Sequence, residues 1–159
     1  MEIRDAAVGD AAEACAVLRR SIAELCGADH ADDPSILARW LANKTPDTVS
    51  VWIRRPDASM LLAVESGVIV AVGMVTDGGE ILLNYVSPDA RFRGVSRTLL
   101  AALEARAAER GAVECRLEST ETVYRFYRAN GYVEDGAPTG KFGMASGFRM
   151  AKSLASRRS

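Results

Sequence analysis

The chain has 159 residues, of which 48% are hydrophobic and 26% are charged, and its formal net charge is −1. This length allows one well-buried core and is short for two domains. The near-zero charge argues against general binding to nucleic acid, which needs a strong basic excess, and no apolar stretch is long enough to span a bilayer. We therefore expect one domain over residues 1–152, a flexible tail over 153–159, and neither nucleic acid nor a membrane as partner.

The first predicted element is a short strand that begins at Ile3. A helix follows, for which Asp10 suits the N-cap and which Gly27 ends. Asp33-Pro34 and Thr45-Pro46 each place a capping side chain before a proline, a combination typical of helix starts. Two further short helices are therefore predicted after these prolines, although residues 49–53 would also suit a strand.

From Met60 onward the pattern changes to extended structure. Residues 60–65, 68–76 and 81–86 are rich in β-branched side chains and are separated by glycine-containing turns. They predict an antiparallel meander of three strands. The third strand is apolar on both faces apart from Asn84, as expected of a strand in the middle of a covered sheet.

A long helix is predicted next, over residues 94–110, because apolar side chains recur every four positions up to Gly111. Residues 113–119 alternate between apolar and charged side chains and predict a strand with one buried face. The order strand, helix, strand implies a right-handed crossover and a parallel strand pair. A short helix over 121–129 and a final strand over 142–150 complete the prediction.

The N-terminal residues and the cysteines indicate the cellular compartment in which the protein is expected. Met1 to Asp5 lack the apolar core of a secretory signal, so we expect a cytoplasmic location. Cys15, Cys26 and Cys115 lie in apolar patterns that are typical of buried reduced thiols rather than disulfides. With one histidine in the chain, no metal site is expected.

The segment from Val86 to Thr98 is the most informative part of the sequence. Pro88 ends the preceding strand, and a loop then leads into the long helix. The first amides of this helix, from about Arg93 to Thr98, point outward at the positive end of the helix dipole. Gly94 would let a phosphate approach the backbone, and nearby arginines add positive charge. The segment matches neither the dinucleotide fingerprint nor the nucleotide P-loop. On these residues alone, an ordinary helix start with solvated arginines explains the pattern equally well.

Two motifs together resemble the GNAT superfamily of N-acetyltransferases. Arg91-x-x-Gly94-x-Ser96 is similar to the family's Arg/Gln-x-x-Gly-x-Gly/Ala signature, with serine where glycine or alanine is usual. Phe126-Tyr127-x-x-x-Gly131-Tyr132 resembles its Phe-Tyr-x-x-x-Gly-Phe landmark. The resemblance is clear over about residues 60–133. It implies an α/β (α+β) fold with a mixed, mostly antiparallel central sheet, a parallel pair splayed at the cofactor site, and helices on both faces.

The resemblance implies an activity as well. The chain would transfer an acetyl or other short acyl group from acyl-CoA to a primary amine by direct attack in a ternary complex, without a metal. Amides at the helix start would hold the CoA pyrophosphate, and the main chain near Tyr85 and Val86 would pair with pantetheine. The cofactor-binding residues implied in this way are Tyr85, Val86, Arg91, Arg93, Gly94, Val95, Ser96, Arg97, Thr98, Tyr124 and Tyr127.

Candidate catalytic residues follow from the same resemblance. Tyr127 matches the tyrosine that the family often uses to protonate the departing thiolate, although it would also suit a core aromatic position. Tyr124, one turn earlier, would be a substitute. Glu80 resembles a glutamate base of the histone-acetylating branch, or is a surface turn residue. Ser119 would order a water molecule, or satisfy a local backbone group.

The acceptor and the partners stay open at this point. The first helices and the C-terminal strand would decide specificity, and His30, Asp32, Asp33 and Trp40 are candidates for recognising a cationic amine, or else are caps and core. The acceptor would be a small-molecule amine or a peptide amine, and a homodimer is compatible with the sequence. The alternative function is a catalytically silent module of the same fold that senses acyl-CoA.

Overall fold

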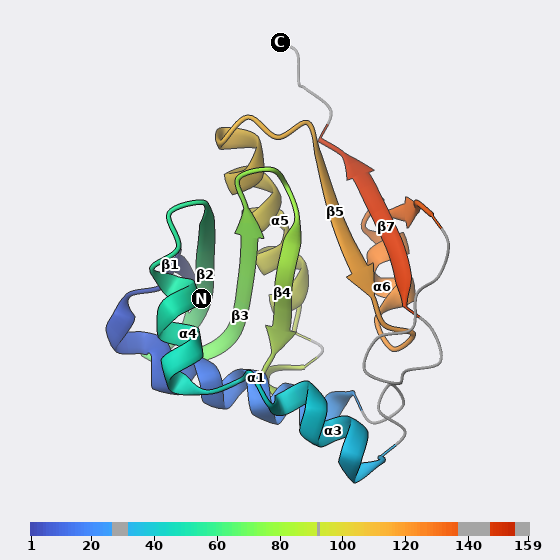
Figure 1. Cartoon of the computed structure of the whole chain (residues 1–159). Coiled ribbons are helices and arrows are strands. Elements are labelled where there is room, and N and C mark those ends of the chain that lie inside the picture. The colour runs from blue at the N-terminus through green and yellow to red at the C-terminus, as the bar shows by residue number, and fades with distance from the viewer. Residues whose placement is uncertain (27–31, 92, 137–146, 155–159) are drawn as a thin grey trace.

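The computed structural model describes residues 1–26, 32–91, 93–136 and 147–154. Two sheets lie side by side, with α1, α3 and α4 on one face of the first sheet and α5 on the other (Figure 1). Within these residues, no helix has both the length and the apolar character that crossing a bilayer requires. Residues 155–159 of the predicted tail lie outside the described part, and the last strand runs as far as Ser153.

The two short helices that follow Asp33-Pro34 and Thr45-Pro46 begin where the sequence predicts. Asp33 accepts hydrogen bonds from the amides of Ser35 and Ile36, and Thr45 accepts one from the amide of Thr48 at 3.2 Å. These caps confirm the two predicted proline-led helices. The bounds are α1 Ala11–Leu25, α3 Pro34–Leu41 and α4 Pro46–Ile53. Gly27, predicted to end the first helix, lies outside the described residues, and α1 is already closed at Cys26.

Asp10 precedes α1 as predicted, but its side chain does not cap that helix. Its carboxylate accepts a hydrogen bond from the amide of Ala7 at 2.7 Å and pairs with Arg4 at 2.9 Å. The reason is a one-turn 3-10 helix, η1 (Val8–Asp10), that comes directly before α1. Asp10 therefore closes the start of η1 and links it to the first strand.

The first sheet has the strand order β1-β2-β3-β4, and every neighbouring pair is antiparallel. This arrangement confirms the predicted meander and adds the N-terminal strand at its far edge. Alternate side chains pack against α1 and α4 on one face and against α5 on the other. The strands are β1 Glu2–Asp5, β2 Ala58–Glu65, β3 Val68–Thr76 and β4 Ile81–Val86.

The second sheet has the order β5-β7-β6 and is also antiparallel. Helix α5 (Val95–Glu109) carries the chain from β4 to β5 (Glu114–Ser119). Helix α6 (Tyr124–Ala129) begins later than the predicted residue 121, since residues 121–123 form a turn. The two-residue strand β6 (Val133–Glu134) was not predicted. Strand β7 (Phe148–Ser153) starts at Phe148, and positions 142–146 of the predicted strand lie outside the described residues.

The predicted parallel pair is reduced to one bridge, between Glu80 and Arg116, supported by a hydrogen bond of 2.9 Å from the Arg116 amide to the Gly79 carbonyl. A β-bulge follows at once, because Val75 pairs with Ile81 and Met74 pairs with Leu83, which leaves Leu82 as the extra residue. Beyond the bulge, residues 83–86 of β4 have no bridge to β5, and the two strands diverge (Figure 1). The expected splay is therefore present and starts at Leu82.

A partly buried polar cluster ties the second sheet to α5, which covers the first sheet. The hydroxyl group of Tyr132 donates to the Glu104 carboxylate at 2.8 Å, and Lys152 Nζ donates to the same carboxylate at 3.1 Å. Burial is the main reason why the pKa of Tyr132 is strongly raised. Glu104 belongs to α5 and Lys152 to β7, so the cluster holds the second sheet against the helix that covers the first.

Gly79 lies at the point where the two sheets meet, and its replacement by alanine is expected to be strongly destabilising. Its φ is +97°, and an added Cβ would lie 2.1 Å from the Glu114 carbonyl oxygen, which belongs to rigid backbone. We expect Gly79→Ala to lower the free energy of unfolding by at least ~2 kcal/mol, since the positive φ alone costs about 1–2 kcal/mol. Urea denaturation measures the loss.

Gly78→Ala is the matched control for this prediction. An added Cβ at Gly78 would meet its nearest atom, Thr76 Oγ1, at 3.9 Å, which is ordinary van der Waals contact. We expect that variant to stay within about 1 kcal/mol of the parent protein. Equal losses in the two variants would show that the close approach of Gly79 to β5 does not matter for stability.

Candidate active site

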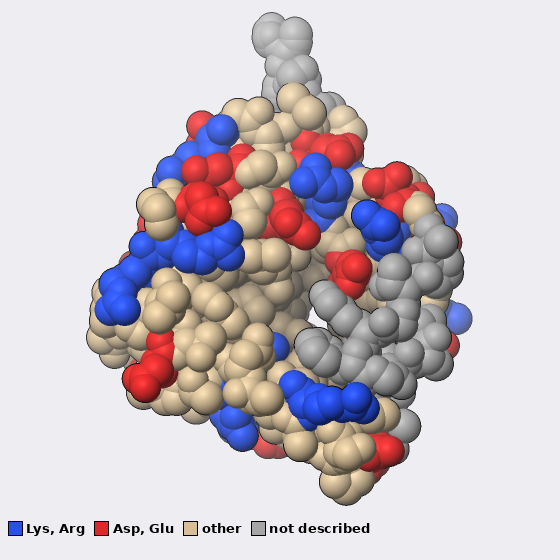
Figure 2. Space-filling view, in the orientation of Figure 1, with Lys and Arg blue, Asp and Glu red and all other residues tan. Residues whose placement is uncertain are grey.

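A cavity of about 450 Å³ opens where β4 and β5 separate. Its volume lies within the roughly 300–1,000 Å³ that is usual for ligand sites. In the space-filling view this face of the molecule is hollowed, with acidic side chains along the upper rim of the hollow (Figure 2). The lining comes from α1 and α3, from residues 81–86 of β4, from residues 94–97 at the start of α5, and from residues between Glu118 and Tyr127.

The start of α5 forms one end of the cavity. Gly94 is the N-cap with φ +77°, and no atom lies within 4 Å of the place where its Cβ would be. The first hydrogen bond of the helix runs from the Thr98 amide to the Gly94 carbonyl at 3.1 Å. The amides of Val95, Ser96 and Arg97 come before it and have no helical carbonyl to bond. This end of the cavity therefore presents main-chain donors and a positive helix dipole to a ligand.

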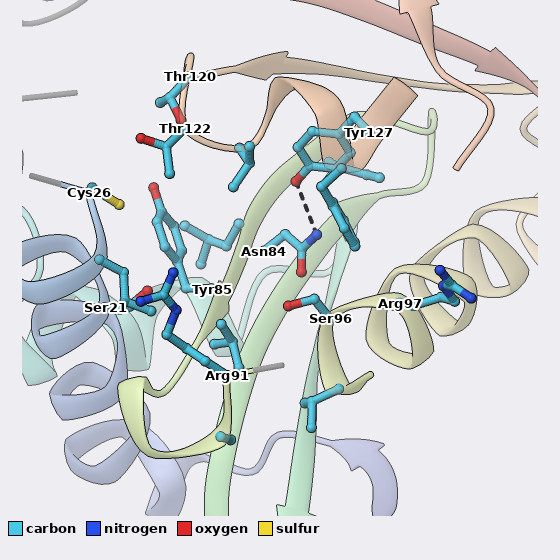
Figure 3. Close-up of a pocket in the computed structure, with 18 of the residues that line it drawn as sticks. Ser21, Cys26, Asn84, Tyr85, Arg91, Ser96, Arg97, Thr120, Thr122 and Tyr127 are labelled. Atoms are coloured by element: carbon cyan, nitrogen blue, oxygen red, sulfur yellow. Dashed lines mark hydrogen bonds between the residues drawn. The ribbon is translucent and has the colours of Figure 1, made fainter. Parts of the chain in front are cut away.

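The predicted cofactor-binding residues of this segment divide into two groups. Gly94, Val95, Ser96 and Arg97 line the cavity, together with Arg91, whose guanidinium extends toward Ser21 of α1 (Figure 3). The side chains of Thr98 and Arg93 are engaged elsewhere. The Thr98 hydroxyl donates to the Gly94 carbonyl at 3.1 Å, and Arg93 pairs with Glu65 at 2.6 Å.

Tyr127 lies across the cavity from Ser96, on α6 (Figure 3). Its hydroxyl oxygen accepts a hydrogen bond of 3.0 Å from Asn84 Nδ2, and its ring packs edge-on against Phe126 and Tyr132. Because the oxygen accepts from Asn84, the hydroxyl proton is left for another acceptor. Burial raises the pKa of Tyr127 to about 12, so this proton stays in place at neutral pH.

The other candidate catalytic residues do not line the cavity. The Tyr124 hydroxyl donates to the Glu134 carboxylate, and its ring packs on Phe148. Glu80 is exposed directly before β4, four residues from Asn84 in the sequence, and does not line the cavity. Ser119 is buried, and its hydroxyl donates to the neighbouring Thr120 carbonyl at 2.8 Å, which agrees with the local alternative.

Several lining residues were not assigned to the site from the sequence. Asn84 had a signal, since it is the one polar residue of an otherwise apolar strand. Trp40 was among the acceptor candidates and does line the cavity, whereas Asp33 caps α3 and His30 lies outside the described residues. The remaining polar or reactive lining residues carry no local sequence signal: Ser21, Cys26, Glu118, Thr120 and Thr122. All three cysteines of the chain are buried, and none forms a disulfide within the described residues.

A family model described as an acetyltransferase (GNAT) domain matches residues 29–154. The chain belongs to the GNAT acetyltransferase family. The match covers most of the chain and extends beyond the region that the two motifs mark. It confirms the resemblance inferred from those motifs and identifies the protein as an N-acetyltransferase by family.

Solved structures of GNAT acetyltransferases share the fold. A GCN5-related N-acetyltransferase from Rhodopseudomonas palustris is 27% identical, with a TM-score of 0.84 over 96% of this chain and 95% of that one. The PaiA N-acetyltransferase from Thermoplasma acidophilum, solved with coenzyme A, is 21% identical, with a TM-score of 0.81 over 96% and 98%. The aminoglycoside 6'-N-acetyltransferase from Enterococcus faecium is 17% identical, with a TM-score of 0.75 over all of both chains. No curated protein sequence matches this GNAT chain.

Proposed function

We propose that this GNAT acetyltransferase moves an acetyl or other short acyl group from acyl-CoA to a primary amine by direct attack in a ternary complex. The observation that carries the proposal is that a single cavity joins the exposed amides of α5 to the hydrogen-bonded pair Tyr127 and Asn84. With these roles, the proposed diphosphate site and the proposed hydrogen-bond donor would lie on the two sides of one gap between strands. The PaiA relative, solved with coenzyme A, supports the choice of cofactor.

The cavity lining fits a CoA thioester. The amides of Val95 to Arg97 would hold the diphosphate, Gly94 leaves room for it, and Arg91 and Arg97 supply opposite charge. Strand β4 has no strand partner on the β5 side beyond Leu82, so its main chain near Tyr85 and Val86 would pair with the amide groups of pantetheine. When bound, acyl-CoA supplies an acyl group activated as a thioester.

The role of Tyr127 follows from its environment. It holds a proton at Oη, and Asn84 fixes the position of this oxygen while leaving the proton directed to another acceptor. With a pKa of about 12, the phenol is a weaker acid than a thiol, whose pKa is usually about 8.5. Tyr127 therefore stabilises negative charge on a leaving sulfur mainly by donating a hydrogen bond.

The acceptor amine must be neutral when it attacks. The proposed site does not include Glu80, because that carboxylate lies away from the cavity. Loss of the amine proton to water supplies the neutral form without a dedicated base.

Release of free CoA thiol from acetyl-CoA tests the proposal. The purified protein should release thiol only when an amine is added, and acetylated amine should accumulate in equal amount. The panel should include arylalkylamines, polyamines, aminoglycosides and peptides with a free N-terminus. If the protein binds CoA by calorimetry and yet releases no thiol with any of these amines, the silent acyl-CoA sensor is the better description.

A further inference from the structure

Asn84 is a polar side chain on an otherwise apolar strand, and it lines the cavity where β4 has left β5. Its partner on β3 is Gly73, where an added Cβ would lie 2.8 Å from Leu103 Cδ1, so both residues face the α5 side of the sheet. Asn84 is partly buried there. A partly buried amide group in a cavity needs partners for its polar atoms, which are therefore the atoms to account for.

The Asn84 amide group makes fewer hydrogen bonds than it is able to make. Nδ2 donates to Tyr127 Oη at 3.0 Å, and within the described part of the chain this is the one hydrogen bond of the side chain. The nitrogen faces Tyr127, so the oxygen Oδ1 faces the other way, toward Ser96 at the start of α5 (Figure 3). An amide oxygen only accepts hydrogen bonds. The cavity thus presents an open acceptor, which suits an N–H group of a ligand.

A CoA thioester carries a matching pair of groups. In its pantetheine arm, an ethylene group separates the sulfur from the nearest amide N–H. In the cavity, the Asn84 amide group separates the Tyr127 hydroxyl, a donor, from Oδ1, an acceptor. Both separations are short, and the polarities are complementary. The Tyr127 hydroxyl would donate to the sulfur while Oδ1 accepts from the amide N–H of the same arm.

We propose that Asn84 binds the pantetheine arm of acyl-CoA through Oδ1, which accepts from the amide N–H nearest the sulfur, and that the same side chain directs the Tyr127 proton to that sulfur. This inference rests on the proposed acyl transfer and adds a binding and positioning residue to its site. Nδ2 sets the direction of the Tyr127 proton, and Oδ1 sets the place of the atom that receives it. Both roles need a group that donates and accepts at once, as an amide does.

Asn84→Leu tests the bond to the ligand. We expect this variant to bind CoA about 10-fold or more weakly, because the pantetheine N–H loses its acceptor in a partly buried site. ADP, which has a diphosphate but no pantetheine, should inhibit the parent protein and the variant equally. Unchanged affinity for CoA, or equal losses for CoA and ADP, would overturn the inference. A parent protein that does not bind CoA in the calorimeter would overturn the proposed function with it.

Asn43→Leu is the matched control for the substitution. Asn43 is exposed and does not line the cavity. Its variant should keep the affinity for CoA within about twofold of the parent value. An equal loss in the two leucine variants would show that the effect does not come from the Asn84 position.

Asn84→Asp tests the polarity of the contact with Tyr127. Aspartate keeps an oxygen for the pantetheine N–H and replaces the N–H donor by a second oxygen. The Tyr127 proton would then go to the carboxylate instead of the sulfur, so we expect kcat to fall about 100-fold while CoA affinity stays within about threefold. If Tyr127 donates to Oδ1 in the parent protein, aspartate preserves that bond, and an unchanged kcat would overturn the inference. CoA binding as weak as in Asn84→Leu would also overturn it.

Discussion

Tyr127→Phe is expected to lower kcat by about 100-fold or more, the usual range for loss of a positioned hydrogen-bond donor to a developing negative charge. Affinity for CoA should change by no more than about twofold, because the proposed diphosphate site is at the other end of the cavity and is not altered. The variant keeps the ring that packs against Phe126 and Tyr132 and loses the hydroxyl group that accepts from Asn84. Steady-state kinetics and CoA calorimetry measure the two quantities separately.

Tyr124→Phe makes the comparison decisive. Both tyrosines lie on α6, but the Tyr124 hydroxyl contacts Glu134 and does not line the cavity. We expect this variant to keep kcat within about twofold of the parent value. A large loss of kcat with Tyr124→Phe and a small one with Tyr127→Phe would show that Tyr124, and not Tyr127, is the donor.

The raised pKa of Tyr127 should also change how the stability of the Tyr127→Phe variant depends on pH. The pKa is about 12 in the folded protein, above the ordinary value of 10.0, because burial disfavours the phenolate. The stabilisation from the protonated phenol is thus complete below pH 10 and is lost as the pH rises toward 12. Thermal unfolding between pH 9 and about pH 11 should show a smaller fall in Tm for Tyr127→Phe than for the parent protein, whereas identical slopes would contradict the burial of this group.

Gly94→Glu is expected to weaken CoA binding by about 100-fold or more. The new carboxylate would extend into open space beside the amides of Val95 and Ser96, where the diphosphate is proposed to bind. Two like charges about 4 Å apart repel by roughly 4 kcal/mol at an effective dielectric constant near 20, which is ample for such a loss. Calorimetry with CoA is the direct measurement.

Gly94→Gln and Gly94→Ala separate charge from strain. All three substitutions share the cost of φ +77° for a side-chain-bearing residue, so they should lose similar stability, about 1–2 kcal/mol each. Glutamine has the size of glutamate without its charge and should weaken CoA binding far less. If the glutamate and glutamine variants bind CoA equally, the anion is not at the start of α5 and the proposed site is wrong.

The elements that could be predicted are those whose interactions lie between residues close together in the sequence. Asp33 and Thr45 cap their helices as expected, because a capping side chain needs only the amides two or three residues ahead. Asp10 does precede α1, but its side chain does not make the predicted cap hydrogen bond. It pairs instead with Arg4, which belongs to another element and could not be identified as its partner from the local sequence. The short strand β6 was missed because its pairing with β7 is a tertiary contact that a two-residue pattern cannot reveal.

In the candidate site, too, the parts that could be predicted are contiguous in the sequence, and the parts that could not are brought together by the fold. The α5 start was predicted because its glycine, its arginines and its orphan amides are contiguous in the sequence. Tyr127 was placed by a motif resemblance, but its partner Asn84 lies 43 positions away and had no assigned role. Glu118 and Trp40 both line the cavity, although they belong to β5 and α3, which are far apart in the sequence. That shared lining depends on the divergence of β4 and β5, which no local pattern encodes.

That divergence bears on how the protein behaves at high concentration. A strand without a neighbour normally exposes a row of main-chain groups to which a strand of another protein can add, and such addition begins aggregation. The unpaired side of β4 instead faces inward, onto a cavity that β5 and the start of α6 close from the opposite side. A strand that added here would have to fit its own side chains between β4 and β5, whereas a slender linear molecule would need less room along the strand. We therefore expect this side of β4 to be less open to self-association than the edge of an ordinary sheet.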